Sequence, residues 1–205
     1  MTISYGGPLT IYGYTPNIRL QSSNTVILTN GISSSAAGSL DASSTVKIRA
    51  SNIKLYNIDI KNTYGTGAQP VAVTANGDKL SFYGCGFYGY QDTLYVKTGN
   101  QYLSHCYVEG AVDYIFGAAN VWLCVSTIAS NGNGAITASS REINDATRYV
   151  FDSSTFQANS SYKTTGSVYL GRPWRVLAKV MVQKSKLSNI INAAGWTTMA
   201  AGATP

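Results

Sequence analysis

The sequence predicts an all-β fold, a right-handed parallel β-helix (solenoid) in which the chain winds in stacked coils. Three observations predict it. Short runs that alternate apolar and polar residues recur along the chain, polar residues recur every 21 or 22 positions, and no run has the length and period of a three-turn helix. Alternation with a period of two is typical of strands, whereas a helix repeats its apolar face every three to four residues.

The alternating runs are bounded by Gly, Asn or Ser, which are frequent in turns. Clear examples are Leu9–Tyr12, Val46–Arg49, Ile53–Tyr56, Val71–Val73 and Val180–Val182. Each of these runs is expected to form one strand of a coil.

One apolar residue per coil aligns when the runs are laid over one another. The aligned residues are Ile60, Phe87, Val108, Ile128, Phe156 and Leu187. Successive residues of this set are 27, 21, 20, 28 and 31 positions apart. The short steps predict coils without loops, and the long steps predict coils that carry loops, such as Tyr64–Gly67 and Ala158–Ser161. Stacked coils would bury these residues against one another. The competing fold, an antiparallel sandwich, does not explain the 21-residue spacing.

The bulk composition narrows the class of protein. A chain of 205 residues is long enough for one domain with a sizeable core, so we expect residues 1–205 to form a single β-helix domain. Charged residues make up only 12%, and no apolar run approaches the roughly 18 residues that span a membrane. The net charge of +6 fits an acidic polysaccharide partner or plain solubility, and no Lys/Arg run indicates nucleic acid. We expect a secreted, extracellular protein.

The three cysteines are Cys85, Cys106 and Cys124, so at least one thiol lies outside any intrachain bridge. Cys85 and Cys106 are 21 residues apart and would stack on adjacent coils, as a buried thiol pair or a disulfide. With no Cys-x-x-Cys motif and one histidine, a structural zinc site is not expected.

Two tempting motifs do not predict function. Gly84–Gly89 is a formal G-x-G-x-x-G, but a dinucleotide site needs a helix after it, and Gln91–Val96 reads as extended. His105 neighbours Cys106, so on a strand the two side chains point to opposite faces. We therefore expect a surface histidine, and a Ser-His-Asp triad has no other histidine to use.

The coil spacing predicts that Asp92 and Asp113 stack on adjacent coils and can share one reaction centre. Adjacent strands lie about 4.8 Å apart, so the two carboxylates would lie about 5 Å apart. At that distance their repulsion is about 3 kcal/mol, so one carboxyl tends to stay protonated while the other stays ionised. One acid and one nucleophile then coexist. The alternative is that both are turn aspartates that bond their own backbone.

Two segments support a functional interpretation of this pair. Asp113 lies in the apolar run Val112–Phe116, where a carboxylate needs a partner. Arg172, locked before Pro173 and Trp174, is a candidate clamp for a carboxylate, and Trp174 offers a flat face to a sugar ring. The alternative is an ordinary loop with a packed tryptophan.

Together these segments resemble the pectin methylesterases (pectinesterases, carbohydrate esterase family 8), and fungal members more than plant ones. The matching stretches are Gln69–Val73, Gly89–Tyr95, Glu109–Gly117 and Leu170–Trp174, in the family's order. The resemblance implies a parallel β-helix and hydrolysis of galacturonate methyl esters in pectin (methylated homogalacturonan) by a monomer, with no metal or cofactor.

The resemblance also implies a role for each site residue. Asp113 would be the nucleophile that attacks the ester carbonyl, and Arg172 would hold it ionised. Gln91, helped by Gln69, would donate to the oxyanion. Asp92 would protonate departing methanol and then activate water. The sugar subsites would be lined by Trp174, Tyr95 and Phe116.

The sequence also departs from the family's pattern. The family's Gly-x-Tyr-x-Glu motif is absent, and Ser139–Arg141 stands where Gln-Gly-Arg is more usual. We expect a domain shortened at both ends, without the N-terminal cap and first coil. Two other functions stay open: a polysaccharide hydrolase on the same scaffold, since a 5 Å carboxylate separation also suits a retaining glycosidase, and a non-catalytic, truncated pectin-binding product.

Overall fold

The computed structural model describes residues 2–4, 9–12, 18–21 and 26–199 of the chain. The outer bounds of the predicted domain, residues 1 and 205, lie outside this part. Within it the strands form three parallel sheets, which we call A, B and C, and each strand pairs with the strands three places away in the chain.

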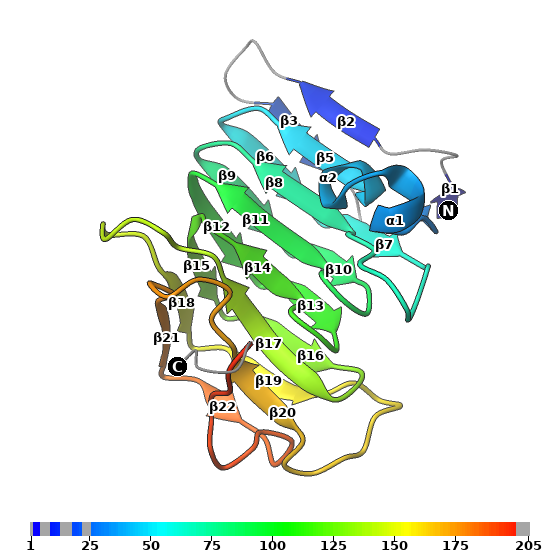
Figure 1. The fold of residues 1–205 in the computed structure, drawn as a ribbon. Helices are drawn as coiled ribbons and strands as arrows, with labels where there is room; N and C mark the ends of the chain where they lie inside the picture. Colours follow the sequence, from blue (N-terminus) through cyan, green and yellow to red (C-terminus); the bar gives the residue numbers. More distant parts are fainter. Residues whose placement is uncertain (1, 5–8, 13–17, 22–25, 200–205) are drawn as a thin grey trace.

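The strands of the three sheets follow one another as A, B, C around every coil. Sheet A contains β1 (Thr2–Ser4), β4 (Ile27–Asn30), β7 (Asp59–Asn62), β10 (Gly86–Tyr88), β13 (Tyr107–Gly110), β16 (Thr127–Ser130), β19 (Thr155–Ala158) and β22 (Lys186–Leu187). Sheet B contains β2 (Leu9–Tyr12), β5 (Val46–Arg49), β8 (Val73–Asn76), β11 (Leu94–Thr98), β14 (Ile115–Gly117), β17 (Gly134–Ser139) and β20 (Val168–Gly171). Sheet C contains β3 (Ile18–Gln21), β6 (Ile53–Tyr56), β9 (Leu80–Tyr83), β12 (Asn100–Ser104), β15 (Asn120–Cys124), β18 (Tyr149–Asp152) and β21 (Val180–Gln183). This arrangement is a parallel β-helix, as predicted (Figure 1).

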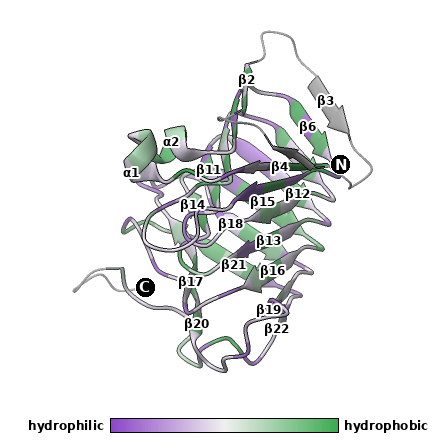
Figure 2. Cartoon of the chain, turned by 90° about the vertical axis from the view of Figure 1, so that its right-hand side faces the viewer, coloured by the Kyte–Doolittle hydropathy of each residue, from purple (hydrophilic) through white to green (hydrophobic). Residues whose placement is uncertain are grey.

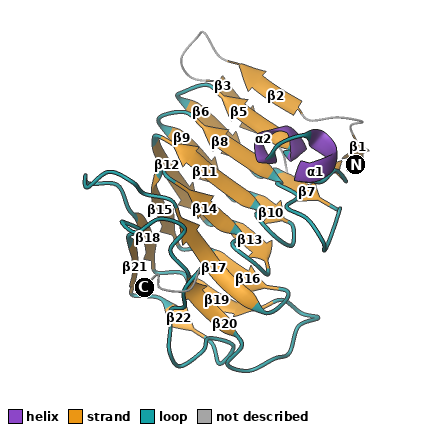
Figure 3. Cartoon of the chain, viewed as in Figure 1, coloured by secondary structure: helices purple, strands orange, loops and turns teal. Residues whose placement is uncertain are grey.

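Two short helices, α1 (Ser34–Ala37) and α2 (Leu40–Ser43), lie beside the upper strands in Figure 3. Each begins after a serine whose hydroxyl accepts a hydrogen bond from a backbone N–H: Ser33 from Ala36 and Ser39 from Ala42. Such caps satisfy donors that a helix leaves unpaired at its start. Both helices have four residues, in agreement with the prediction that no helix reaches three turns.

The predicted register of the coils is confirmed on sheet A. Phe87 pairs with Ile60 and Val108, Ile128 pairs with Val108 and Phe156, and Leu187 pairs with Phe156. All six except Leu187 are buried, and Leu187 is 44% exposed on the last strand of the sheet. The three long steps do carry loops, which follow β7, β17 and β19.

The core fills the inside of the coils with stacked apolar side chains. In Figure 2 green, apolar segments run along the strands next to purple, polar ones, as the alternation requires. Cys85 and Cys106 are free and buried in this core, so the thiol pair is confirmed and a disulfide is not formed. Cys106 donates from Sγ to the carbonyls of Phe82 and Ser104, at 3.4 and 3.5 Å.

A two-residue turn joins sheet C to sheet A on successive coils. The first residue of this turn has a positive φ each time: Asn57, Gly84, His105, Val125, Ser153 and Lys184, at 49° to 60°. His105 is exposed there, as predicted, with Nδ1 2.8 Å from the Ser104 hydroxyl. The formal G-x-G-x-x-G segment runs from this turn into strand β10, and no helix follows it.

Candidate active site

Asp92 and Asp113 occupy the same position on adjacent coils, in the turn that joins sheet A to sheet B. Their φ values are 58° and 49°, in the left-handed region that aspartate tolerates better than most residues. The Asp92 N–H donates to the Val112 carbonyl at 3.0 Å, and Tyr95 pairs in register with Phe116. The two aspartates therefore stack one coil apart, as their 21-residue spacing predicts.

Both carboxyl groups are buried, with Asp92 7% and Asp113 6% exposed. Among the described residues, neither side chain accepts a hydrogen bond from its own turn, in contrast to Asp145, which accepts from the Thr147 N–H. The alternative of two self-bonding turn aspartates is therefore wrong. Two buried carboxyls this close must share their environment with a cation or a proton.

Arg172 supplies the cation. It follows strand β20, where its N–H donates to the Thr137 carbonyl at 2.9 Å. Its Nε and Nη2 donate to Oδ1 and Oδ2 of Asp113 at 2.8 and 2.6 Å. The hydrogen bonds that the guanidinium donates to Asp113 raise the pKa of Arg172. A two-point ion pair of this geometry fixes the orientation of the Asp113 side chain.

Asp92 lies in a different electrostatic environment. Burial raises its pKa to about 8, the neighbouring Asp113 adds to the rise, and Arg172 opposes it. Asp92 is therefore protonated at neutral pH and below, while Asp113 pairs with the Arg172 guanidinium. A protonated carboxyl beside an arginine-paired one is the arrangement that chemistry with one acid and one nucleophile needs.

A cavity of about 230 Å³ opens over the pair. It is lined by Leu40, Gln69, Gln91, Asp92, Asp113, Phe116, Ala138, Arg172, Trp174 and Met199. The structure thus brings seven of the eight predicted site residues to one cavity. The eighth, Tyr95, stacks on Phe116 with ring centroids 4.4 Å apart. A larger cavity beside it, of about 320 Å³, has no carboxylate in its lining.

The two glutamines reach the cavity from different positions. Gln91 precedes Asp92 in the turn, whereas Gln69 lies in the loop before β8 and accepts from the Ser34 hydroxyl at 3.0 Å. The register of β8 and β11 pairs Val73 with Leu94, so Gln69 lies one residue before the position opposite Gln91. The 22-residue spacing therefore does not stack the two glutamines, although both line the cavity.

The turn that carries Gln91 and Asp92 is anchored by residues that the sequence did not single out. Asn131 donates from Nδ2 to the Gly89 carbonyl at 3.0 Å and to Glu109 Oε1 at 3.1 Å. Glu109 also accepts from the Tyr107 hydroxyl at 2.7 Å. In the sequence, the Asn131–Gly132 pair indicates only a turn, so no local pattern predicts that Asn131 anchors the turn of Gln91 and Asp92. Leu40, Ala138 and Met199 were missed for the same reason.

Within the described part of the chain, no group of three or more His, Cys, Asp or Glu side chains is placed to hold a metal ion. In the same part, no helix has the length and apolarity needed to cross a membrane.

The fold and the site together define a parallel β-helix protein with a paired acid and carboxylate in an aromatic-lined cavity. The pectinesterase family matches residues 15–204, and the chain belongs to that family. "Probable pectinesterase A" of Aspergillus niger is 57% identical over 206 residues, which cover 100% of this chain and 63% of that protein. The chain therefore spans less than two thirds of that relative's length.

Solved structures agree with this assignment. The deglycosylated pectin methylesterase from Aspergillus niger superposes with a TM-score of 0.94 at 53% identity, over 100% of this chain and 71% of that chain. The carrot pectin methylesterase superposes with a TM-score of 0.81 at 27% identity, over 98% of this chain and 68% of that chain. The expected likeness to fungal members, rather than plant ones, is confirmed by these identities.

Proposed function

We propose that this chain hydrolyses the methyl esters of galacturonate units in pectin, releasing methanol and leaving a free carboxylate. One observation carries the proposal: a carboxylate fixed by Arg172 lies beside a second carboxyl, Asp92, whose pKa of about 8 keeps it protonated. Family membership supports the ester substrate, since the relatives named above are a pectinesterase and pectin methylesterases.

In the first step, an Asp113 oxygen attacks the ester carbonyl carbon and forms a C–O bond. Negative charge develops on the carbonyl oxygen, where the side-chain amides of Gln91 and Gln69 donate hydrogen bonds. Collapse of this intermediate breaks the bond to the methoxy group, and Asp92 gives its proton to the departing oxygen. Methanol leaves, Asp113 is acylated as an anhydride, and Asp92 is now a carboxylate.

In the second step, Asp92 takes a proton from a water molecule, whose oxygen attacks the acyl carbon. The C–O bond to Asp113 breaks, and Asp113 leaves as a carboxylate that Arg172 stabilises again. Asp92 holds a proton as at the start, and the product unit carries a carboxylic acid. The cycle balances without a metal or cofactor: the proton that Asp92 gives to methanol is replaced by one from water, and the other proton of that water stays on the product acid.

The aromatic side chains of the cavity would bind the sugar rings. Trp174 and Phe116 line it, with ring centroids 6.2 Å apart, and Tyr95 extends this wall by stacking on Phe116. Flat aromatic faces suit the apolar faces of pyranose rings, while the polar groups of the site orient the ester. We propose these three residues as the sugar subsites.

Methanol release from highly methylated pectin tests the proposal. We expect release from the parent chain and at least a thousandfold slower release from the Asp113→Asn variant, at equal fold measured by circular dichroism. Methanol with unchanged pectin chain length supports an esterase, whereas new reducing ends would instead support a polysaccharide hydrolase. Binding without methanol release from a folded parent would support the non-catalytic alternative.

We also propose that the protein is a secreted monomer. The Aspergillus niger pectin methylesterase was crystallised with an N-acetylglucosamine stub on an asparagine, so that relative is glycosylated. Glycosylation of asparagine is typical of secreted proteins. Light scattering during gel filtration tests the monomer, and a mass near 21.8 kDa is expected for this chain.

A further inference from the structure

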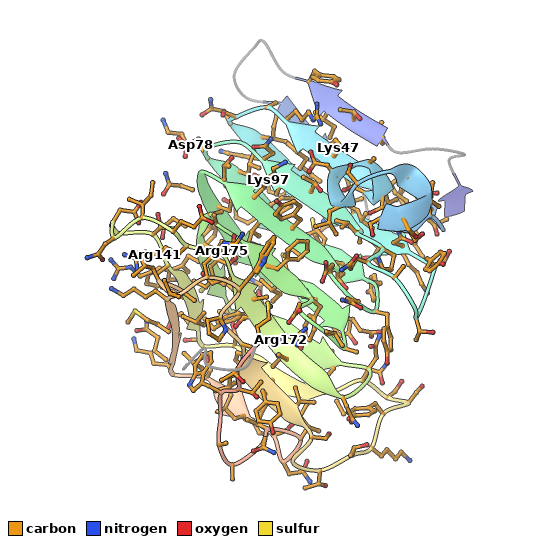
Figure 4. All side chains as sticks on the ribbon, viewed as in Figure 1. Lys47, Asp78, Lys97, Arg141, Arg172 and Arg175 are labelled. Atoms are coloured by element: carbon orange, nitrogen blue, oxygen red, sulfur yellow. The ribbon has the colours of Figure 1, made fainter. Side chains whose placement is uncertain are left out.

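A groove of about 370 Å³ lies on the outer face of sheet C. It is lined by the beginnings of three successive strands, at residues 79–81 for β9, 100–102 for β12 and 120–122 for β15. None of these residues lines the cavity over Asp92 and Asp113. Figure 4 shows Asp78, which precedes the groove residue Lys79, toward the upper left of the molecule and Arg172 near its lower middle. The groove is therefore separate from the active site.

One side of the groove belongs to a row of cations and amides at the start of the sheet C strands. The residues in register there, on five successive coils, are Leu80, Gln101, Val121, Tyr149 and Val180. The residues directly before them, which form the row, are Lys79, Asn100, Asn120, Arg148 and Lys179. Asn120 donates from Nδ2 to Asn100 Oδ1 at 2.9 Å, and Asn100 donates from Nδ2 to Asp78 Oδ1 at 2.8 Å. These bonds hold both amides in the row.

The row carries an excess of positive charge. Lys79 and Lys179 are exposed, and neither they nor Arg148 forms an ion pair with a described residue. The carboxylate beside the row is Asp78, whereas Asp145, in the loop before Arg148, is already in an ion pair within that loop. Three cations against Asp78 leave two positive charges without a partner. A polymer with repeated negative charges would be attracted to this row.

The other side of the groove is aromatic. Because residues two apart on a strand share a face, Tyr102 and Trp122 lie on the same face as Asn100 and Asn120. Tyr102 pairs in register with Trp122, which is 41% exposed. The ring of Tyr102 also lies 6.0 Å from the ring of Tyr83, so aromatic residues follow one another on three successive coils. Flat aromatic faces of this kind suit sugar rings.

Both rows repeat at a spacing that suits a linear sugar chain. Neighbouring strands lie about 4.8 Å apart, which is close to the length of one pyranose unit. A linear polysaccharide along the axis of the coils would therefore meet one position of each row for each unit. Lysine and arginine pair with carboxylates, and amides bond hydroxyl groups. A chain with a carboxylate on each ring fits both rows, whereas a neutral methyl ester leaves the cations without a partner.

We propose that the groove on sheet C is a second, non-catalytic binding site for de-esterified pectin, a linear chain of galacturonate units with free carboxylates. The inference rests on the proposed function, which makes such chains the product of the active site. Lys79, Arg148 and Lys179 pair with the carboxylates, and Tyr102 and Trp122 stack on the sugar rings. The protein is thereby held on polymer that it has already processed, while its active-site cavity stays open to the next ester.

Co-sedimentation with insoluble, cross-linked polygalacturonate measures this binding without any turnover. All proteins in the assay carry Trp174→Ala, which weakens binding in the active-site cavity. The double variant Lys79→Gln, Lys179→Gln is expected to bind about tenfold more weakly, with a smaller dependence on salt. Trp122→Ala is expected to cause a similar loss of about tenfold, because an exposed tryptophan contributes much of the contact area.

Two matched controls separate the groove from the rest of the surface. The double variant Lys61→Gln, Lys163→Gln removes two exposed cations from β7 and from the loop after β19, so its net charge equals that of the test variant. Tyr64→Ala removes a 44% exposed ring from the loop after β7. Both controls should bind as the parent does. Equal binding by the parent and every variant would overturn the groove, and so would an equal loss in both double variants.

Two further outcomes would also overturn the proposal. Release from the gel by dextran sulfate as readily as by soluble polygalacturonate, at equal charge, would show contact with any polyanion. A dimer in gel filtration that Trp122→Ala dissociates would assign the groove to a second copy of the chain. Thermal unfolding at the parent's temperature shows that each variant is folded, so that a loss of binding reports on the groove.

The two proposals fail in different ways. Trp122→Ala should leave KM for fully methylated pectin unchanged, because that polymer has no carboxylates for the row to pair with. If the parent releases no methanol but its sedimentation still depends on Lys79, Lys179 and Trp122, the esterase proposal is overturned and the groove is supported. If methanol is released and sedimentation is the same in every variant, the esterase proposal is supported and the groove is wrong.

Discussion

The Arg172 guanidinium donates a hydrogen bond to each oxygen of Asp113, with Nε 2.8 Å from Oδ1 and Nη2 2.6 Å from Oδ2. This contact joins residues 59 positions apart, from the turn before β14 and the end of β20. It distinguishes the two stacked aspartates, because Asp92 has no ion-pair partner among the described residues. The chemistry proposed for the site follows from this difference between an ion-paired and an unpaired aspartate.

Replacing Arg172 should test the two-point contact directly. Arg172→Lys keeps a positive charge but loses the planar fork, so we expect methanol release to fall about a hundredfold. Arg172→Gln leaves Asp113 buried without a cation and should also lower the free energy of unfolding by about 3 kcal/mol. Denaturant titration and methanol assays check both values. Arg148→Lys, away from the cavity, is the control. A similar loss of methanol release in this variant would contradict a specific role for the Arg172–Asp113 contact.

The pH dependence of turnover should reflect Asp92. The acid that protonates methanol is present only while Asp92 holds its proton, and its pKa is about 8. The rate of ester cleavage should therefore decline as the pH rises through about 8. Rates at saturating substrate between pH 5 and 10 give this profile. A flat profile across this range would exclude Asp92 as the proton donor.

The pH dependence of stability should depend on the same residue. Asp92 is protonated in the folded protein at pH values where an unfolded chain, with a pKa near 3.9, has ionised it. The folded state then binds more protons, so its stability falls as the pH rises from about 4 to about 8. Asp92→Asn removes this decline and should be more stable than the parent at pH 8 by a few kcal/mol. Thermal unfolding at pH 4 and pH 8 measures the difference, which should be smallest at pH 4.

Trp174 should act on binding more than on chemistry. Its ring lines the cavity and forms no hydrogen bond with either aspartate. Trp174→Ala is expected to raise KM for methylated pectin about tenfold and to change kcat less. Trp122→Ala removes an equally large, 41% exposed ring from sheet C and serves as the matched control. Equal effects of the two variants would argue against a sugar subsite at Trp174.

Asn131 should position the reactive turn without touching the substrate. Asn131→Ala loses the bonds to Gly89 and Glu109, so stability should fall by about 2 kcal/mol and kcat by about tenfold. Asn131→Asp places a carboxylate beside Glu109 and should be worse than Asn131→Ala. A turn that only stabilises the fold would lower stability and leave the kcat of the folded fraction unchanged.

Much of the fold is predictable from the sequence because a coil has a nearly constant length where it lacks loops. The spacing between Asp92 and Asp113, and between Cys85 and Cys106, is 21 residues, and both pairs stack on adjacent coils. Local alternation then assigns buried positions such as Phe87 and Val108 correctly. Periodicity and spacing are properties of the backbone, so they are readable before any tertiary contact is known.

Other parts depend on contacts that no spacing reveals. Gln69 lies in a loop, where the coil length no longer fixes the register. Asn131 bonds Gly89 from 42 positions away, and Asp41 meets Lys97 from 56 positions away. Such contacts depend on how loops and short helices fold over the sheets, which composition and period do not determine.

The bare coil between Asp92 and Asp113 also limits where this chain tolerates changes in length. Insertions can lengthen the loops after β7 and β19, since those segments lie outside the stacked strands. A single inserted or deleted residue between the two aspartates would shift the later strands by half of their two-residue repeat, and core and surface positions would exchange. The reactive pair is thus tied to an unbroken count of 21 residues, and natural variation in length should be found in those loops and not between the two aspartates.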